Sequence, residues 1–177
     1  MRYFLIGYKS SGKSTLGRML ARQMNLRFID LDELIEEREG KTIPQLYNSL
    51  GDEGFRIREW EALKEVIQHD DVVVALGGGA PCHCDNMNLI EEYGESIYIR
   101  HDNETLISRL KSATGDRPIV LNKTDEELRM YVQDIRNQCE HHYLRAKYIV
   151  DGKDLTVAKL IEVLKNNPAR SQTDSAP

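Results

Sequence analysis

Residues 7–14 restrict the fold of this chain more than any other segment. They read Gly-Tyr-Lys-Ser-Ser-Gly-Lys-Ser and match the pattern G-x-x-x-x-G-K-[ST] in full, directly after the apolar residues 3–6. Apolar residues then follow at helical spacing, namely Leu16, Met19, Leu20 and Met24, so the pattern lies between an expected strand and an expected helix. The glycines let successive backbone N–H groups face one anion, and the helix N-terminus adds partial positive charge. The segment predicts a phosphate loop that binds a nucleoside triphosphate.

Two side chains of this loop have defined tasks in phosphate binding. Lys13 is expected to bridge the β- and γ-phosphates, and the Ser14 hydroxyl is expected to ligate Mg²⁺. Because such a lysine neutralises charge on the transferred phosphoryl group, it is also a predicted catalytic residue. The predicted ATP-binding residues of this segment are Ser10, Ser11, Gly12, Lys13, Ser14 and Thr15.

The rest of the chain alternates short apolar runs with helical patterns. Further strands are predicted at residues 27–30, 72–76, 96–100 and 148–150, and helices at 31–38, 53–68, 103–111 and 157–164. Thr42 and Pro44 indicate another helix start, and Gly51 is expected to end that segment. Five strands interleaved with helices predict an α/β fold with a five-stranded parallel sheet and helices on both faces.

One domain accounts for most of the 177 residues, and we expect it to span residues 1–166. Residues 112–123 show no periodicity and contain Gly115 and Pro118, so we expect a mobile loop there. Thr124 and Glu127 have the spacing of a capping box, which predicts that a helix begins at this point. Residues 167–177 are expected to be a polar, disordered C-terminal tail.

Charge and cysteine content exclude several classes of protein. Lys and Arg number 24 and Asp and Glu number 29, a formal net charge of −5, which argues against a nucleic-acid binder because phosphate contacts need a basic surface. The apolar runs fall far short of the roughly 18 residues that span a bilayer, and the apolar stretch at residues 3–6 is too short for a signal peptide. The three cysteines, Cys82, Cys84 and Cys139, cannot all pair, which suggests a reducing compartment. We therefore expect a cytoplasmic protein that does not bind membranes.

A second group of candidate site residues follows the phosphate loop. Asp30 and Asp32 end the second predicted strand, where parallel sheets place the ligand crevice. One carboxylate could hold a water molecule of the Mg²⁺ shell, and the other could orient or deprotonate an acceptor hydroxyl. Acidic residues also favour a helix N-terminus without any further role. Arg56 could clamp a carboxylate in a bidentate fork or lie on a charged helix surface.

Two more segments suit the same site. Gly77, Gly78 and Gly79 follow the most hydrophobic predicted strand and allow close backbone approach to a small ligand. Arg117 lies in the loop at residues 112–123, where a lid cation could cover the γ-phosphate. Together these residues predict an enzyme that phosphorylates a hydroxyl of a small molecule that carries a carboxylate.

Residues 118–125 suggest an alternative, because they read like the apolar strand and N-K-x-D motif with which GTPases recognise guanine. A GTPase also needs a D-x-x-G switch, and no Asp lies three residues before a glycine in this sequence. The capping box at Thr124 explains the same residues more simply. A regulator that binds nucleotides without catalysis is a second alternative, and the complete set of Lys13, Ser14, Asp30 and Asp32 argues against it.

A zinc site is a third alternative, built from Cys82, Cys84 and Cys139 with the two histidines at 141 and 142. Cys-x-Cys without a second closely spaced cysteine pair does not have the spacing of structural zinc sites. We interpret these residues as idle thiols and surface histidines.

The chain resembles the shikimate kinase family over about residues 1–164. The resemblance depends on five motifs in order, which are residues 7–14, Asp30-x-Asp32, Phe55-Arg56, Gly77-Gly78-Gly79 and Arg117-Pro118. It implies a P-loop fold like that of nucleoside monophosphate kinases, with a mobile lid at about residues 112–124. It also implies phosphorylation of shikimate by ATP, on the route to chorismate and the aromatic amino acids.

The resemblance implies a role for each site residue. Asp32 and Arg56, with the backbone around Gly78, would hold shikimate, and Asp30 would lie in the outer shell of Mg²⁺. Arg117 would reach the ATP phosphates, so that Lys13, Asp32 and Arg117 form the predicted catalytic set. ATP and the acceptor are the expected partners of a protein that acts as a monomer.

Two positions depart from the pattern of the family. The family usually has Gly where this chain has Ser10. It also carries an Arg four residues before a Tyr near the end of the helix after the lid, as a second clamp on the shikimate carboxylate. Counted from Tyr143, that position is Cys139. Arg136 lies one turn earlier, and we predict that it binds the carboxylate instead. The alternative is another acceptor such as homoserine, a smaller zwitterion that would suit the loss of the Arg and the gain of Glu140.

Overall fold

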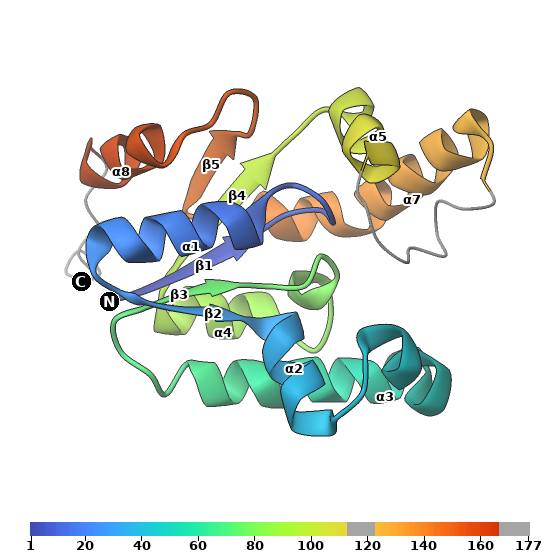
Figure 1. Ribbon diagram of the computed structural model, residues 1–177, viewed down its shortest axis with the longest axis horizontal. Helices are drawn as coiled ribbons and strands as arrows, with labels where there is room; N and C mark the ends of the chain where they lie inside the picture. Colours follow the sequence, from blue (N-terminus) through green and yellow to red (C-terminus); the bar gives the residue numbers. More distant parts are fainter. Residues whose placement is uncertain (113–122, 167–177) are drawn as a thin grey trace, which may run out of the picture.

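Five parallel strands form the centre of the structure, a computed structural model that describes residues 1–112 and 123–166 (Figure 1). They are β1 (Arg2–Ile6), β2 (Arg27–Asp30), β3 (Val72–Ala75), β4 (Glu95–Arg100) and β5 (Tyr148–Asp151). Their order across the sheet is β2-β3-β1-β4-β5, and every neighbouring pair is parallel. The chain thus winds to both sides of β1, an arrangement that places the ligand crevice at the carboxyl ends of the central strands. The predicted α/β sheet is confirmed.

The helices lie close to the predicted positions. They are α1 (Lys13–Met24), α2 (Leu31–Glu39), α3 (Ile43–Val66), α4 (Asn86–Tyr93), α5 (Asn103–Ser112), α7 (Asp125–Tyr143) and α8 (Val157–Asn166), with a short 3₁₀ helix η1 (Ala80–Cys82). Neither α4 nor η1 was predicted. The apolar residues buried by α4 are only Met87 and Ile90, which are too few to show a helical period.

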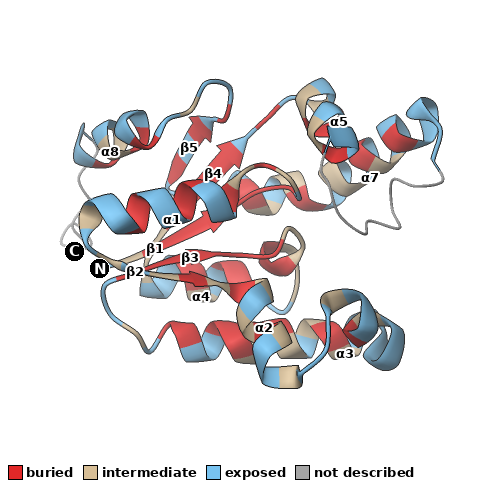
Figure 2. Cartoon of the chain, viewed as in Figure 1, coloured by how far each residue is buried: buried red, intermediate tan, exposed pale blue. Residues whose placement is uncertain are grey.

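Successive side chains of each strand point to opposite faces of the sheet and build two cores. From β1, Tyr3 and Leu5 pack in the core under α1 and α8, whereas Phe4 and Ile6 pack in the core that includes α3, α4 and α7. Figure 2 shows the central strands β1, β3 and β4 as almost continuously buried, with the outer sides of the helices exposed. Burial on both faces explains why the strands read as unbroken apolar runs in the sequence.

The capping residues begin two helices as the sequence predicts. Thr42 and Gln45 form a complete capping box at α3, and Thr124 and Glu127 form another at α7. Asp125 lies in the first turn of α7 and accepts a hydrogen bond from Lys111 at 2.6 Å. Of the residues that resemble a guanine-binding motif, Thr124 and Asp125 therefore belong to the cap and first turn of α7, and residues 118–122 lie outside the described residues.

Gly51 separates two helical segments within α3, as the sequence predicts. Its φ of 70° and ψ of −179° lie outside the helical region, so two helical segments meet there at a kink. The second segment carries Phe55 and Arg56 and ends at Val66, two residues before the predicted end.

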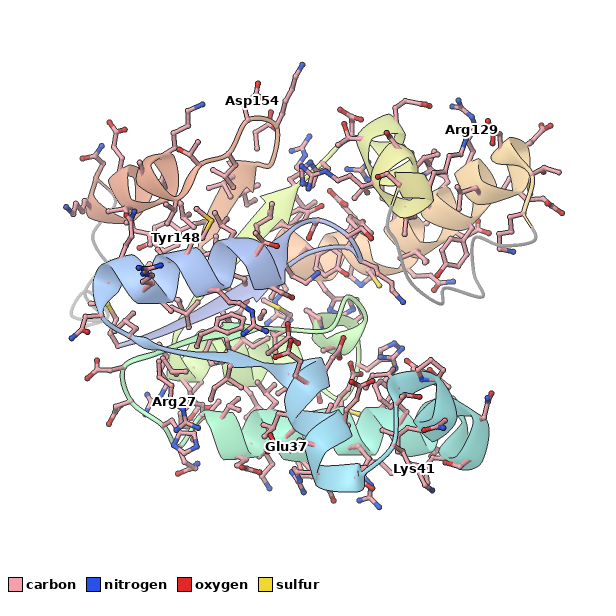
Figure 3. The ribbon with its side chains drawn as sticks, viewed as in Figure 1. Arg27, Glu37, Lys41, Arg129, Tyr148 and Asp154 are labelled. Atoms are coloured by element: carbon pink, nitrogen blue, oxygen red, sulfur yellow. The ribbon has the colours of Figure 1, made fainter. Side chains whose placement is uncertain are left out.

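Charged side chains cover the outer surface, where the labelled Glu37, Lys41, Arg129 and Asp154 are all exposed (Figure 3). Within the described ranges, no helix combines the length and apolar character that a membrane span requires. The central part of the predicted lid at residues 113–122, which contains Arg117, lies outside the described residues, as does the predicted tail at 167–177.

Candidate active site

The phosphate loop joins β1 to α1 through residues with left-handed backbone. Gly7 and Gly12 have φ values of 138° and 96°, and Ser10 has φ of 66°. A Cβ on Gly7 would lie 2.9 Å from the backbone oxygen of Ile99, so both the conformation and the space require glycine at this position. At Ser10 the left-handed conformation costs roughly 1–2 kcal/mol, and the loop accepts this strain.

Lys13 is the first residue of α1, and its side chain lies against the inside of the loop. The ammonium group donates hydrogen bonds to the backbone oxygens of Gly7 and Tyr8, at 2.8 and 2.7 Å. Burial lowers the pKa of Lys13 to about 8, although the nearby carboxylates of Asp32 and Asp30 oppose this effect. The loop thus holds a buried cation at a helix N-terminus, where anions bind.

Ser14 and Asp30 meet at the mouth of the loop. The Ser14 hydroxyl donates a hydrogen bond to Oδ2 of Asp30 at 2.5 Å. The other oxygen of Asp30 accepts a hydrogen bond from the backbone N–H of Asp32 at 3.1 Å and caps α2. Asp30 is therefore a helix cap and also a contact of the phosphate loop.

Asp32 lies in the first turn of α2, next to the glycine run. A Cβ on Gly77 would lie 2.7 Å from Oδ1 of Asp32 and 3.0 Å from Oε1 of Glu59, so the glycine leaves room for two carboxylates. Burial and the charge of Asp30 raise the pKa of Asp32, whereas Lys13 and Lys9 lower it. A carboxylate with a raised pKa beside a nucleotide site is a candidate general base.

Arg56 lies between two carboxylates of α3. It donates a hydrogen bond through Nη1 to Oε2 of Glu59 at 2.5 Å, and its Nε lies 3.3 Å from Oδ1 of Asp52. Burial raises the pKa of Glu59 to about 7, and the charge of Arg56 opposes this shift. A Cβ on Gly79 would lie 2.7 Å from Nη1 of Arg56, so the guanidinium extends to the glycine run instead of the helix surface.

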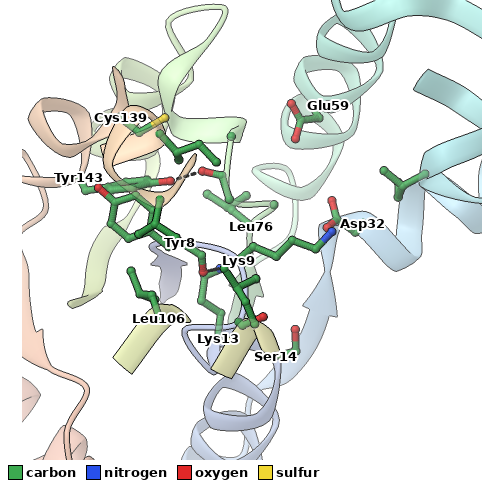
Figure 4. Close-up of a pocket in the computed structure, with 18 of the residues that line it drawn as sticks. Tyr8, Lys9, Lys13, Ser14, Asp32, Glu59, Leu76, Leu106, Cys139 and Tyr143 are labelled. Atoms are coloured by element: carbon green, nitrogen blue, oxygen red, sulfur yellow. Dashed lines mark hydrogen bonds between the residues drawn. The ribbon is translucent and has the colours of Figure 1, made fainter. Parts of the chain in front are cut away.

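One cavity of about 1010 Å³ joins the phosphate loop to these groups (Figure 4). Its lining includes most of the predicted site residues, which are Ser10, Gly12, Lys13, Ser14, Thr15, Asp30, Asp32, Arg56, Gly77, Gly78 and Gly79. Ser11 is buried within the loop and does not line the cavity. Pockets for one drug-sized ligand occupy about 300–1,000 Å³, so this volume suits a nucleotide together with a small second ligand.

Comparison with known proteins shows the family to which the chain belongs. The family model for shikimate kinase matches residues 9–166. The chain belongs to the shikimate kinase family. It is 41% identical over 161 residues to the shikimate kinase of Phocaeicola vulgatus, covering 91% of this chain and 92% of that protein. The shikimate kinase of Bacteroides fragilis is 42% identical over 162 residues, with 92% of this chain and 90% of the relative covered.

Solved shikimate kinases share the fold over nearly the full length. The crystal structure from Bacteroides thetaiotaomicron gives a TM-score of 0.90 at 38% identity, covering 93% of this chain and 98% of that one. The Acinetobacter baumannii enzyme in complex with shikimate gives 0.84 at 27% identity, with 96% and 95% covered. As a member of the shikimate kinase family, the chain is an ATP-dependent kinase that phosphorylates an alcohol group, and the predicted P-loop kinase fold is confirmed.

The structure of this shikimate kinase family member does not bring Arg136 to the cavity. Its guanidinium donates hydrogen bonds to the side chain of Asn103, to the backbone oxygen of His101 at 3.2 Å and to Glu140 at 3.2 Å. Cys139, by contrast, lines the cavity. Three residues along a helix amount to about 300° of rotation and 4.5 Å of rise. Arg136 therefore projects toward β4 and α5, and the geometry does not support its predicted role as a carboxylate clamp.

A cluster around Glu140 ties the phosphate loop to α7, and the sequence did not predict it. The hydroxyls of Tyr8 and Tyr98 both donate to Oε2 of Glu140, at 2.5 and 3.0 Å. Burial favours a raised pKa for Glu140, but these hydrogen bonds and the charge of Arg136 hold the pKa below its ordinary value. Glu140 is not among the residues that line the cavity, so it gives no support to a zwitterionic acceptor.

Tyr143 connects α7 to the glycine run. Its hydroxyl donates a hydrogen bond to the backbone oxygen of Gly78 (Figure 4), and its ring packs against those of Tyr8 and Tyr98. The spacing of Glu140 and Tyr143 on the buried side of α7 was the signal that could have indicated this cluster.

Two cations line the cavity in addition to the predicted ones. Arg109, in the last turn of α5, donates to the backbone oxygen of Ser11 at 3.3 Å. Lys9 lies in the phosphate loop itself. Their positions depend on how α5 and the loop fold over the cavity, which sequence spacing does not show.

Proposed function

We propose that this kinase transfers the γ-phosphoryl group of Mg·ATP to a hydroxyl of shikimate, with the reaction taking place where the phosphate loop meets the glycine run. The observation that carries the proposal is that Lys13, Asp32 and Arg56 line one shared cavity of about 1010 Å³. Donor and acceptor can therefore bind side by side, which direct transfer requires.

In this proposal the phosphate loop and the start of α1 bind the nucleotide. The backbone N–H groups of Ser10, Ser11 and Gly12, with the side chain of Lys13 and the first helical turn at Ser14 and Thr15, would surround the phosphates. Phosphate oxygens would replace the carbonyl partners that Lys13 now has at Gly7 and Tyr8. Arg117, which lies outside the described residues, is proposed as an additional cation on the γ-phosphate, and Arg109 lines the same end of the cavity.

Ser14 and Asp30 suit a magnesium ion. Their oxygens are in contact at 2.5 Å, and Mg²⁺ prefers oxygen ligands while it keeps several of its own water molecules. We propose that Ser14 ligates the ion directly and that Asp30 binds it through water. When bound, the ion would neutralise charge on the phosphates.

In this proposal the acceptor is bound by Asp32, Arg56 and the backbone around Gly78. The Arg56 guanidinium can pair with the carboxylate of shikimate, and its pairing with Glu59 and Asp52 fixes its orientation. Asp32 would accept the proton of the attacking hydroxyl while that oxygen bonds to the γ-phosphorus and ADP leaves. The raised pKa of Asp32 makes its carboxylate a better proton acceptor than an ordinary aspartate.

A coupled ADP-release assay tests the proposal. Native enzyme is expected to turn over with shikimate and to show little turnover with homoserine, and Asp32→Asn is expected to lower kcat by about 10²–10⁴. ATP binding, measured by calorimetry, should stay within about threefold of native, because Asp32 does not contact the nucleotide in the proposed arrangement. Efficient use of homoserine but not shikimate would contradict the proposed acceptor, and full activity of Asp32→Asn would contradict the proposed base.

We also propose that the enzyme works as a cytoplasmic monomer. Apart from Ser11, which is buried within the loop, and Arg117, which lies outside the described residues, the proposed donor and acceptor residues line a cavity within one chain. Cys82, Cys84 and Cys139 are free thiols, as suits a reducing compartment. Sedimentation analysis of the active enzyme tests the oligomeric state, and activity confined to a dimer would contradict it.

A further inference from the structure

Lys9 occupies a position between the two halves of the cavity. Its backbone packs against the glycine run, because a Cβ on Gly78 would lie 3.1 Å from the nitrogen of Lys9. The side chain is exposed and lines the cavity. Figure 4 shows its ammonium end directed across the cavity toward Asp32. Lys9 thus lies where a group leaving the phosphate loop would meet the acceptor.

The charges around the cavity explain why a cation at the position of Lys9 matters. Among the described lining residues, the carboxylates are Asp30, Asp32, Asp52 and Glu59, and the cations are Lys9, Lys13, Arg56 and Arg109. The formal charges of these eight groups sum to zero when all of them are ionised. A triphosphate and an acceptor carboxylate add several negative charges, so each lining cation matters for bringing the phosphoryl group near Asp32.

The other three cations are placed for different tasks. Lys13 is buried inside the loop, Arg56 is paired with Glu59 and Asp52, and Arg109 contacts the backbone of Ser11 at the nucleotide end. Lys9 combines an end directed to Asp32 with a flexible four-carbon stem that can follow a moving charge.

We propose that Lys9 is a further catalytic residue of the phosphoryl transfer, whose ammonium group contacts the phosphoryl oxygens as the group passes from ATP to the acceptor hydroxyl beside Asp32. This role rests on the function proposed above. In the step, the bond from the γ-phosphorus to the oxygen that bridges to the β-phosphate breaks, and a bond to the acceptor oxygen forms. The hydroxyl proton goes to Asp32, and Lys9 stays protonated throughout. Its charge offsets the repulsion between the phosphoryl group and the Asp32 carboxylate, which is greatest in the transition state.

The test compares Lys9→Met and Lys9→Arg with Lys165→Met, an exposed lysine at the end of α8, as the matched control. Lys9→Met is expected to lower kcat with saturating ATP and shikimate by about tenfold or more, while both KM values change by less than about threefold. Lys9→Arg should keep most of the activity, and Lys165→Met should match native enzyme.

A binding measurement separates catalysis from folding. ADP, shikimate and aluminium fluoride mimic the phosphoryl group in transfer, and Lys9→Met should weaken this complex by about the same factor as kcat. The complex of ADP and shikimate without fluoride should be nearly unchanged. A kcat within twofold of native would overturn the role of Lys9, as would a loss confined to the KM for shikimate, which would assign Lys9 to the acceptor carboxylate. Native enzyme that fails to phosphorylate shikimate would instead contradict the proposed function.

Discussion

Ser10 is a residue of the phosphate loop that has a left-handed backbone conformation although it is not glycine. Its φ of 66° lies in the left-handed region that glycine adopts without a steric cost. Ser10→Gly is therefore expected to raise the free energy of unfolding by about 0.5–1 kcal/mol, after the greater entropy of glycine in the unfolded chain is subtracted. Urea unfolding measures the change. A lower stability would mean that interactions of the Ser10 side chain outweigh the strain.

Cys139 is the residue at which acceptor affinity can be changed. It lines the cavity, so an arginine there could join Arg56 on the shikimate carboxylate. Such a charged hydrogen bond contributes about 1.5–3 kcal/mol, and Cys139→Arg should lower the KM for shikimate by about ten- to a hundredfold. Cys139→Ser is the matched control, and Arg136→Ala should leave this KM unchanged because Arg136 does not reach the cavity. A folded Cys139→Arg variant with unchanged KM would contradict the placement of the carboxylate.

At the scale of elements, the kink in α3 sets the direction of the segment that carries Arg56. Gly51 has a φ of 70° and a ψ of −179°, a backbone conformation that residues other than glycine almost never adopt. Gly40 has a φ of 62° and a ψ of 24°, which is the common left-handed conformation. A Cβ at either position meets nothing within 4 Å, so only the backbone term differs. Gly51→Ala should cost about 1–3 kcal/mol and raise the KM for shikimate.

Gly40→Ala is the control for this effect. It should cost about 1 kcal/mol, and Gly40→Asn should cost less, because Asn tolerates the left-handed region. Gly51→Asn should gain no such relief. Thermal unfolding of the four variants orders these costs, at about 2–4 °C per kcal/mol for a chain of this size. Equal losses at the two glycines would show that the kink does not depend on Gly51.

The sequence was most informative for elements with a clear period or a cap. The strands were found because burial on both faces leaves unbroken apolar runs, as in Val72-Val73-Val74, and the capping boxes at Thr42 and Thr124 marked two helix starts. The short helix α4 was missed because Met87 and Ile90 alone do not show a period. Gly51 was identified as a break between two helical segments, but the angle at which they meet depends on packing, which the sequence does not show.

At the scale of the whole molecule, interactions between residues that are close in the sequence could be predicted, and interactions between distant residues could not. The phosphate loop lies within eight residues, so its place in the site could be read directly, and Asp30 and Asp32 came from their position at a strand end. The position of Arg136 could not be predicted in the same way, because a difference of three residues on a helix decides which side the guanidinium faces. The contact of Glu140 with Tyr8 and Tyr98 joins residues 132 and 42 positions apart, and only the packing of α7 on the sheet brings them together.

The protons that the molecule takes up when MgADP binds report the protonation state of Lys13. Burial lowers the pKa of Lys13 to about 8, so at pH 8 about half of the ligand-free molecules carry a neutral Lys13 amine. Nucleotide phosphates favour the ammonium form, and MgADP binding should therefore take up about half a proton at pH 8, less at pH 6.5 and more at pH 9. Calorimetry in buffers of different ionisation enthalpy measures this uptake, and Lys13→Met should abolish its dependence on pH.

The same group links stability to pH with a definite sign. The lysine titrates near its ordinary value of 10.5 in the unfolded chain and near 8 in the folded one, so the unfolded state binds more protons between these values. The contribution of Lys13 to the free energy of unfolding should therefore rise as pH increases from 8 toward 10.5 and be lost as pH falls through 8. Subtracting the urea stability of Lys13→Met isolates this rise from other titrating groups. A flat difference together with MgADP binding that takes up no protons at pH 8 would show that Lys13 is fully charged in the ligand-free enzyme.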